Sequence, residues 1–196
     1  TTLIKSILGM VVPDSGFIMF NGKNIRHNDA YRNEIGYMPQ IGRYPDNMTI
    51  GQLLSMMKDI RHSHTAQDEE LIHAFDLPSM AAKRLRTLSG GTRQKLSASL
   101  AFLFCPSVLI LDEPTAGLDP VASEILKDKI RREKENGKLI LITSHILSEL
   151  DDLITHVLYL QDGRLRYHNS WQQLKEETRE ARLSKAIARL MQPERT

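Results

Sequence analysis

The sequence predicts an α/β fold: a mostly parallel sheet with a helical subdomain inserted into it. Over residues 1–40 and again over 106–166, short apolar runs alternate with segments of helical periodicity, as in βαβ units. These runs lack the alternation of apolar and polar side chains that marks a half-exposed strand, which is typical of parallel strands covered on both faces. Between residues 46 and 104 the strand pattern is absent and helical periodicity takes over. We therefore expect a helical insertion within an α/β core.

Each expected element has its own local signal. The expected strands are short apolar runs bounded by turn residues, at 17–20, 35–38, 108–111, 139–143, 157–160 and 165–167. The expected helices carry apolar side chains at helical spacing, at 3–8, 50–60, 71–75, 95–104 and 121–136. A capping-box pattern, Ser170 with Gln173, predicts one final helix that extends to Met191.

Composition and charge limit the classes of function. The chain has 196 residues, of which 41% are hydrophobic and 26% charged, and its formal net charge is +2. This balance is typical of a globular protein and argues against a dedicated nucleic-acid binder, which normally carries a larger basic surplus. The single cysteine, Cys105, excludes a disulfide framework and fits a reducing cytoplasm. The longest stretch without charge, 96–111, is shorter than the ~20 residues of a membrane-spanning helix.

Two adjacent carboxylates follow the apolar run at 108–111. Asp112 and Glu113 leave the expected strand at its carboxyl end, and open α/β sheets bind ligands at that edge. There Asp112 can hold a hydrated Mg²⁺ while Glu113 polarises a water molecule. Taken alone, the pattern fits a buried strand followed by a solvated acidic turn equally well.

A pair of glycines precedes the expected helix upstream of these carboxylates, where residues 88–94 read LSGGTRQ. Ser89, Gly90 and Gly91 can bring a hydroxyl and backbone N–H groups close to a phosphate, and the helix dipole favours negative charge there. Taken alone, this pattern is more typical of a flexible turn with a helix N-cap.

Together with three further segments, these two patterns resemble the motifs of ATP-binding-cassette (ABC) ATPases. LSGGTRQ resembles the signature motif, YMPQ at 37–40 the Q-loop, AGLDP at 116–120 the D-loop and TSH at 143–145 the H-loop, in the order of that family. The resemblance covers almost the whole chain. It implies a P-loop NTPase (RecA-like) core with a helical subdomain that binds ATP and Mg²⁺.

The first residues resemble the end of a phosphate-binding loop. In the pattern G-x-x-x-x-G-K-[ST], the lysine reaches the β- and γ-phosphates and the hydroxyl holds Mg²⁺. The chain begins with TTLI, so the resemblance implies that Thr1 supplies this hydroxyl and that Thr2 belongs to the nucleotide site. Because the lysine and glycines are absent before Thr1, we expect a nucleotide-binding domain that is truncated at its amino-terminal end. We also expect negligible ATP turnover from these 196 residues alone.

The resemblance further implies a role for each matched position within one subunit. Mg²⁺ would be held by Thr1, Asp112 and Gln40. Glu113 would be the general base for the attacking water, and Gln40 would touch that water or the metal. His145 would be a polar clamp near the γ-phosphate.

Other matched positions would act between two such domains, in a homodimer or a heterodimer. The nucleotide held by the second subunit would be contacted from the signature segment, by Ser89, Gly90, Gly91 and Gln94. Asp119, in the D-loop segment, would lie at the dimer seam and help to couple the two sites.

Motif spacing favours the ATPase subunit of a transporter. Residues 41–87 are too few for the long coiled coils that chromosome-maintenance relatives carry between Q-loop and signature. A transmembrane permease would then be the partner, and the protein would be peripheral on the cytoplasmic face of the cell membrane. The expected segments are a first part of the core, a helical subdomain, a second part of the core and a helical tail: 1–45, 46–104, 105–168 and 169–196.

Two readings of the whole chain follow from these motifs. The compact segment 9–16, without a β-rich regulatory domain after the last strand, most resembles ABC-2-type exporter subunits. These include multidrug and copper-processing or nitrous-oxide-reductase accessory systems. The alternative is a non-catalytic module that lacks the phosphate-binding loop and only occupies a dimer interface or a membrane partner.

Overall fold

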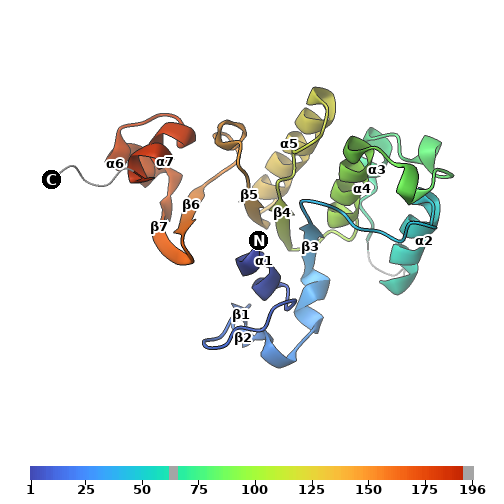
Figure 1. Cartoon of the computed structure of the whole chain (residues 1–196), viewed down its shortest axis with the longest axis horizontal. Helices are drawn as coiled ribbons and strands as arrows, with labels where there is room; N and C mark the ends of the chain where they lie inside the picture. Colours follow the sequence, from blue (N-terminus) through green and yellow to red (C-terminus); the bar gives the residue numbers. More distant parts are fainter. Residues whose placement is uncertain (62–65, 192–196) are drawn as a thin grey trace. The chain divides into compact units, whose positions relative to one another are not determined.

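The computed structural model describes residues 1–61 and 66–191, except for the side chain of residue 27. The chain divides into two units, 1–143 and 144–196. Within the described residues, the first unit holds a parallel sheet with helices α1 to α5, and the second holds an antiparallel hairpin with α6 and α7 (Figure 1). The division into four segments stays a prediction.

Three parallel strands form the sheet of the first unit, in the order β3 (Ile35–Met38), β4 (Val108–Asp112) and β5 (Leu139–Thr143). Asp112 lies opposite Thr143 in the register, so the carboxyl ends of these strands meet at one edge. The sequence predicted all three strands and their parallel pairing, and both predictions are confirmed. The expectation that the strands are covered on both faces is confirmed for β4, in the middle, which is buried over its last four residues. It is wrong for β5, whose residues are exposed or only partly buried.

Helix α1 (Thr2–Ile7) packs on this sheet through one apolar face. The cluster that joins helix and sheet consists of Ile4, Leu8, Tyr31, Ile35 and Ile110. A short antiparallel pair follows, β1 (Met19–Phe20) with β2 (Lys23–Asn24), and Asn21 in its turn has a positive φ of 47°. Only the last two residues of the strand expected at 17–20 are therefore in a strand.

The inserted region folds into α2 (Ile50–Ile60), α3 (Glu70–Ala74) and α4 (Gly90–Phe102). A reciprocal capping box starts α2: the Thr49 hydroxyl accepts from the Gln52 amide, and the Gln52 side chain accepts from the Thr49 amide. Short 3₁₀ turns connect the larger elements, at Ile25–His27, Ala30–Glu34, Pro78–Met80, Leu85–Thr87 and, in the second unit, Leu147–Glu149.

A glycine in the sheet allows α4 to lie directly against β3. A Cβ atom on Gly36 would be 2.0 Å from the Ala101 carbonyl oxygen, so a larger residue cannot occupy this position without moving the helix. Gly36 is near the start of β3 and Ala101 near the end of α4. The opposite end of α4, its N-terminus, therefore extends toward the carboxyl edge of the sheet.

Helix α5 (Pro120–Glu135) is joined to the inserted region by a network of ion pairs. The buried Lys129 ammonium pairs with Asp68 and with Glu70, 3.0 Å from its Oε2, both from the segment at the start of α3. Within α5 the same ammonium lies 2.8 Å from Glu133 Oε1. The buried Lys129, together with Arg132, which also pairs with Glu70, thus links α5 to the helical insertion.

The second unit consists of β6 (His156–Gln161), β7 (Arg164–Ser170), α6 (Trp171–Thr178) and α7 (Leu183–Met191). The predicted hairpin is confirmed, with strands that are longer than expected. The prediction of one final helix is wrong, because Arg179 adopts φ 56° in the left-handed region and ends α6. Among the helices of the described residues, none combines the length and apolar character needed to cross a membrane.

The expected capping box at the start of α6 forms only in half. The Ser170 hydroxyl accepts from the Gln173 amide at 3.1 Å. The Gln173 side chain donates to Glu177 instead of turning back, and the Ser170 amide donates to Asn169 Oδ1 at 3.0 Å. A neighbouring asparagine thus replaces the second bond of the box.

Candidate functional site

The carboxyl edge of the sheet presents a buried carboxylate, Asp112, at the end of β4. The Thr143 hydroxyl, at the end of the neighbouring β5, donates a hydrogen bond to Asp112 Oδ1. Burial and, second, the negative charge of Asp112 raise the pKa of the nearby Tyr37. The sequence singled out Asp112 but not Thr143 as its hydrogen-bond donor, although the parallel register of two adjacent runs could have paired them.

Glu113 follows in an unusual backbone conformation. Its φ of 53° lies in the left-handed region, which costs a non-glycine residue roughly 1–2 kcal/mol. Three hydrogen bonds hold this main chain: the Glu113 amide donates to Thr143 O at 3.0 Å, and its carbonyl accepts from the Ala116 amide and from Gln94 Nε2, both at 3.1 Å. Such strain persists only where the surroundings hold it, and it concentrates at functional sites.

The N-terminus of α4 forms the second part of the site. The helix begins at Gly90, five residues before the expected start at Lys95, because the Ser89 hydroxyl accepts from the Thr92 amide at 3.2 Å and caps it. Ser89 and Gly90 are exposed, and a Cβ atom on Gly90 would meet nothing within 4 Å. The first-turn amides of a helix lack intrahelical acceptors, so this end suits an anion that approaches from outside the chain.

A lysine that the sequence reading did not single out ties this helix to the segment before α5. Lys95 Nζ lies 2.7 Å from Asp119 Oδ2, while Asp119 Oδ1 caps α5 by accepting from the Ala122 amide at 2.9 Å. The hydrogen bond from Lys95 and, second, the one from Ala122 lower the pKa of Asp119. Lysine at this place carries no motif of its own, so only the tertiary structure reveals the pair.

The remaining predicted positions lie at three places. Gln40 is exposed two residues beyond the end of β3, at the same edge as Asp112. Thr1 is the exposed N-cap of α1 and Thr2 its first residue. His145 follows β5 by two residues and belongs to the second unit. The sheet edge therefore brings together Gln40, Asp112 and Glu113, and their roles stay predictions.

The donor set fits Mg²⁺ of the kind that keeps water and phosphate ligands. Mg²⁺ in phosphate-transfer sites is usually held by one or two carboxylates, with waters and phosphate oxygens completing the octahedron. Asp112 supplies one buried carboxylate, and the described residues contain no cluster of three or more histidine, cysteine or acidic side chains that could hold a metal alone.

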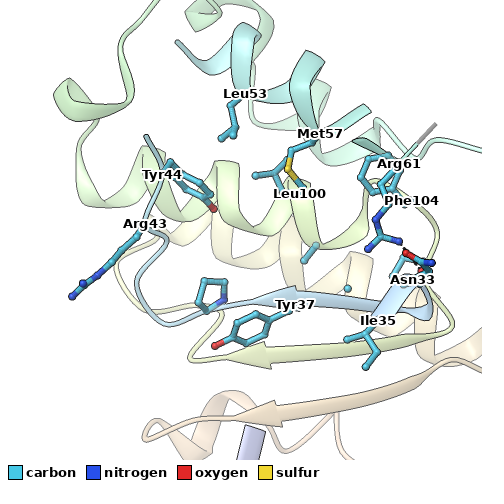
Figure 2. A pocket seen from close by; sticks show the side chains of 14 residues that line it. Asn33, Ile35, Tyr37, Arg43, Tyr44, Leu53, Met57, Arg61, Leu100 and Phe104 are labelled. Carbon is cyan, nitrogen blue, oxygen red and sulfur yellow. Dashed lines mark hydrogen bonds between the residues drawn. The ribbon is translucent and has the colours of Figure 1, made fainter. Parts of the chain in front are cut away.

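A groove of about 270 Å³ lies beside the sheet, between β3, α2 and the end of α4. Figure 2 shows its apolar lining, which includes Met57 and Leu100, with Arg43 and Arg61 near its ends. Arg61 is held in place: its Nη1 donates to the Asn33 carbonyl at 2.8 Å, and its guanidinium carbon lies 5.3 Å from the centroid of the Phe104 ring. The groove thus combines an apolar floor with fixed positive charge.

Comparison with known proteins gives the class. The family model described as ABC transporter matches residues 1–116. The fold is similar to a solved ATP-binding subunit of an ABC transporter, with a TM-score of 0.89, 26% sequence identity, and coverage of 97% of this chain and 82% of that chain. The chain belongs to the ABC transporter family, and its fold is that of a P-loop NTPase, as the motifs predicted.

Individual relatives include both long and short proteins. The chain is 36% identical over 180 residues to the phospholipid-transporting ATPase ABCA3 of Homo sapiens. The matched region covers 89% of this chain and 11% of that protein. It is 31% identical to the ABC transporter ATP-binding protein YtrB of Bacillus subtilis, over 90% of this chain and 61% of that protein. It is also 31% identical to the Nod factor export ATP-binding protein I of Burkholderia lata, over 84% and 56% respectively. The chain thus spans less than two thirds of each.

Proposed function

We propose that this chain is the ATP-binding and ATP-hydrolysing part of an ABC transporter that powers export through a membrane permease. The observation that carries the proposal is the edge at which buried Asp112 and strained Glu113 meet the capped N-terminus of α4. Phosphoryl transfer needs positioned charge more than covalent chemistry, and this edge offers a carboxylate for the metal, a second for a proton, and helix amides for phosphate.

Each residue has a distinct task in the proposed reaction. Asp112, with Thr1 and Gln40, would hold Mg²⁺, which when bound neutralises charge on the phosphates. Glu113 would accept the proton of a water whose oxygen forms a bond to the γ-phosphorus, while the bond to the β–γ bridging oxygen breaks and ADP leaves with that electron pair. His145 would donate a hydrogen bond to the γ-phosphate. In a dimer, Ser89, Gly90 and Gly91 of one copy would face the nucleotide of the other.

The test uses the natural protein that contains this sequence. Phosphate release from ATP should require Mg²⁺, and Asp112→Asn should reduce it by about 100-fold or more, because the metal loses its buried carboxylate. Thermal melting of the variant checks that it remains folded. If nucleotide binds but the parent protein releases no phosphate, the non-catalytic binding module is the better account. If the parent neither binds nor hydrolyses ATP, the proposal is wrong.

We further propose that the groove beside β3 receives a cytoplasmic helix of the permease, which would hold the protein at the inner face of the membrane. Its apolar floor with Met57 and its fixed Arg61 suit an amphipathic helix that carries a carboxylate. The relative named for Nod factor export supports an exporter. Multidrug and copper-processing or nitrous-oxide-reductase systems are the export systems to test.

Membrane fractionation of the natural host tests the docking. Met57→Glu places a charge in the groove and should move the protein from the membrane fraction to the soluble fraction. Met191→Glu, at an exposed position on α7 in the second unit, is the matched control and should leave the distribution unchanged. Equal membrane retention of both variants would contradict the proposed docking site.

A further inference from the structure

The N-terminal part of α4 is fastened to the loop that carries Glu113, at three points along that loop. Near its start, Gln94 Nε2 donates to the carbonyls of Glu113 at 3.1 Å and Pro114 at 3.5 Å. In the middle, a Cβ atom on Gly91 would be only 2.9 Å from the Gly117 carbonyl oxygen. The third point, at the end of the loop, is the ion pair with Asp119. All three contacts lie within one chain, so they join the N-terminal part of α4 to the loop of its own site.

Of the three contacts, the one made by Gln94 is nearest to Glu113, the proposed general base. Its side chain is buried, with 5% of the residue exposed, and the sequence reading placed it among residues that touch nucleotide. Its amide instead donates to the main chain of Glu113 in the same chain. A buried amide that loses such a partner costs free energy, so the bond is maintained as long as α4 keeps its position.

The three hydrogen bonds to the Glu113 main chain come from three different parts of the chain. The amide of Glu113 is held by Thr143 of the sheet, and its carbonyl by Ala116 of the same loop. Gln94 alone among the three belongs to the inserted helical region. The left-handed conformation of Glu113 persists only while its hydrogen bonds hold it. Since one of these bonds comes from α4, a change in the position of α4 would change the conformation of Glu113.

Lys95 adds a second, independent connection. Its ammonium pairs with Asp119 and also lies 6.0 Å from the centroid of the Phe75 ring in the helical region. Since Asp119 caps α5, the pair connects the helical region to the far end of the same loop. Movement of α4 would therefore pull on the loop at both ends.

We propose that Gln94 and Lys95 are positioning residues that make the conformation of Glu113 depend on the position of α4 within the same chain. The inference rests on the proposed function. When the Ser89 end of α4 contacts the nucleotide of a second copy, the same helix also determines the conformation of Glu113, the general base of its own site. The two sites of a dimer would thus be coupled through each chain separately, by a hydrogen bond and an ion pair.

Steady-state ATP hydrolysis by the full natural protein tests the inference. Gln94→Met keeps the side-chain length but removes the donor, and it should lower kcat by about tenfold to 100-fold while KM for ATP changes less than about twofold, because misplaced catalytic groups slow the chemical step. Lys95→Met should also lower kcat, and Lys95→Arg should restore it. Gln172→Met, at an exposed position on α6, is the matched control and should retain the parent kcat.

The possible results separate the inference from the proposed function. A raised KM with unchanged kcat would show that Gln94 binds nucleotide, and it would overturn the inference but not the proposed function. Parent-like kcat in both Gln94→Met and Lys95→Met would also overturn it. If Gln94→Met fails to fold in a melting experiment, the comparison of Lys95→Met with Lys95→Arg decides. A parent protein without ATP turnover would refute the proposed function and the inference with it.

Discussion

Removal of the buried Lys129 ammonium should strongly destabilise the protein. Its side chain is 6% exposed and pairs with Asp68, Glu70 and Glu133, the last of which is also 6% exposed. Breaking a buried pair from one side costs about 3–5 kcal/mol, because it leaves charge without compensation. Lys138 would still neutralise Glu133, so we expect Lys129→Met to lower the free energy of unfolding by about 3 kcal/mol, at the lower end of that range.

Urea denaturation followed by circular dichroism measures this loss. Arg131→Met is the matched control on the same helix, because the Arg131 side chain is 34% exposed and pairs with the exposed Asp128, and such surface pairs contribute less than about 1 kcal/mol. The reasoning would be refuted if the two variants lost the same free energy of unfolding. It would also be refuted if Lys129→Met were as stable as the parent.

The pH dependence of that difference gives a second check. Burial alone would lower the pKa of Lys129, but hydrogen bonds to Asp68, Glu133 and Glu70 outweigh it and raise the pKa above the ordinary value of 10.5. Burial alone would raise the pKa of Glu133, and Lys129 and Lys138 instead lower it from 4.5. The Lys129 contribution is therefore present below its ordinary pKa and lost at strongly alkaline pH. The Glu133 contribution is present above 4.5 and lost in acid, so the gap between parent and Lys129→Met should narrow at both extremes.

Three further substitutions test the fold and the site. Gly36→Ala should destabilise the protein by about 3 kcal/mol in urea denaturation, because its Cβ would collide with the Ala101 carbonyl; an unchanged midpoint would contradict the close packing. Thr143→Val should cost about 1.5–3 kcal/mol in the same assay by removing the hydroxyl that donates to Asp112, and parent-like stability would argue against this bond. Ser89→Arg should lower ATP turnover by about 100-fold, while loss of the helix cap costs only about 0.5–2 kcal/mol of stability, and retained cooperative turnover would argue against a shared site.

The core of the fold could be predicted because its signals are local. Strands β3, β4 and β5 are mostly apolar runs, which is typical of parallel strands, and β4 in the middle is buried while β5 is only partly buried. The start of α4 was misplaced because two glycines favour a loop by propensity, whereas the Ser89 hydroxyl supplies the cap that starts a helix there. The break at Arg179 was missed because arginine rarely adopts a positive φ.

In the candidate site, too, local motifs could be recognised from sequence, whereas contacts between distant residues could not. Asp112, Glu113 and Ser89 could be proposed from sequence because each belongs to a motif of neighbouring residues, and their roles stay predictions. The contacts made by Gln94, Lys95 and Thr143 were not found, since each partner lies 19 or more residues away and only the packing of α4 and β5 brings them together. Hydrogen bonds across elements leave no local pattern in sequence.

The role of Glu113 as general base is the central claim, and one comparison tests it most directly. ATP turnover and ATP binding are measured for Glu113→Gln and for Glu135→Gln, an exposed position near the end of α5, in the natural protein. We expect Glu113→Gln to lose turnover by about 100-fold or more with binding retained, as for loss of a general base, while Glu135→Gln matches the parent. Hydrolysis by Glu113→Gln at the parent rate would contradict the account.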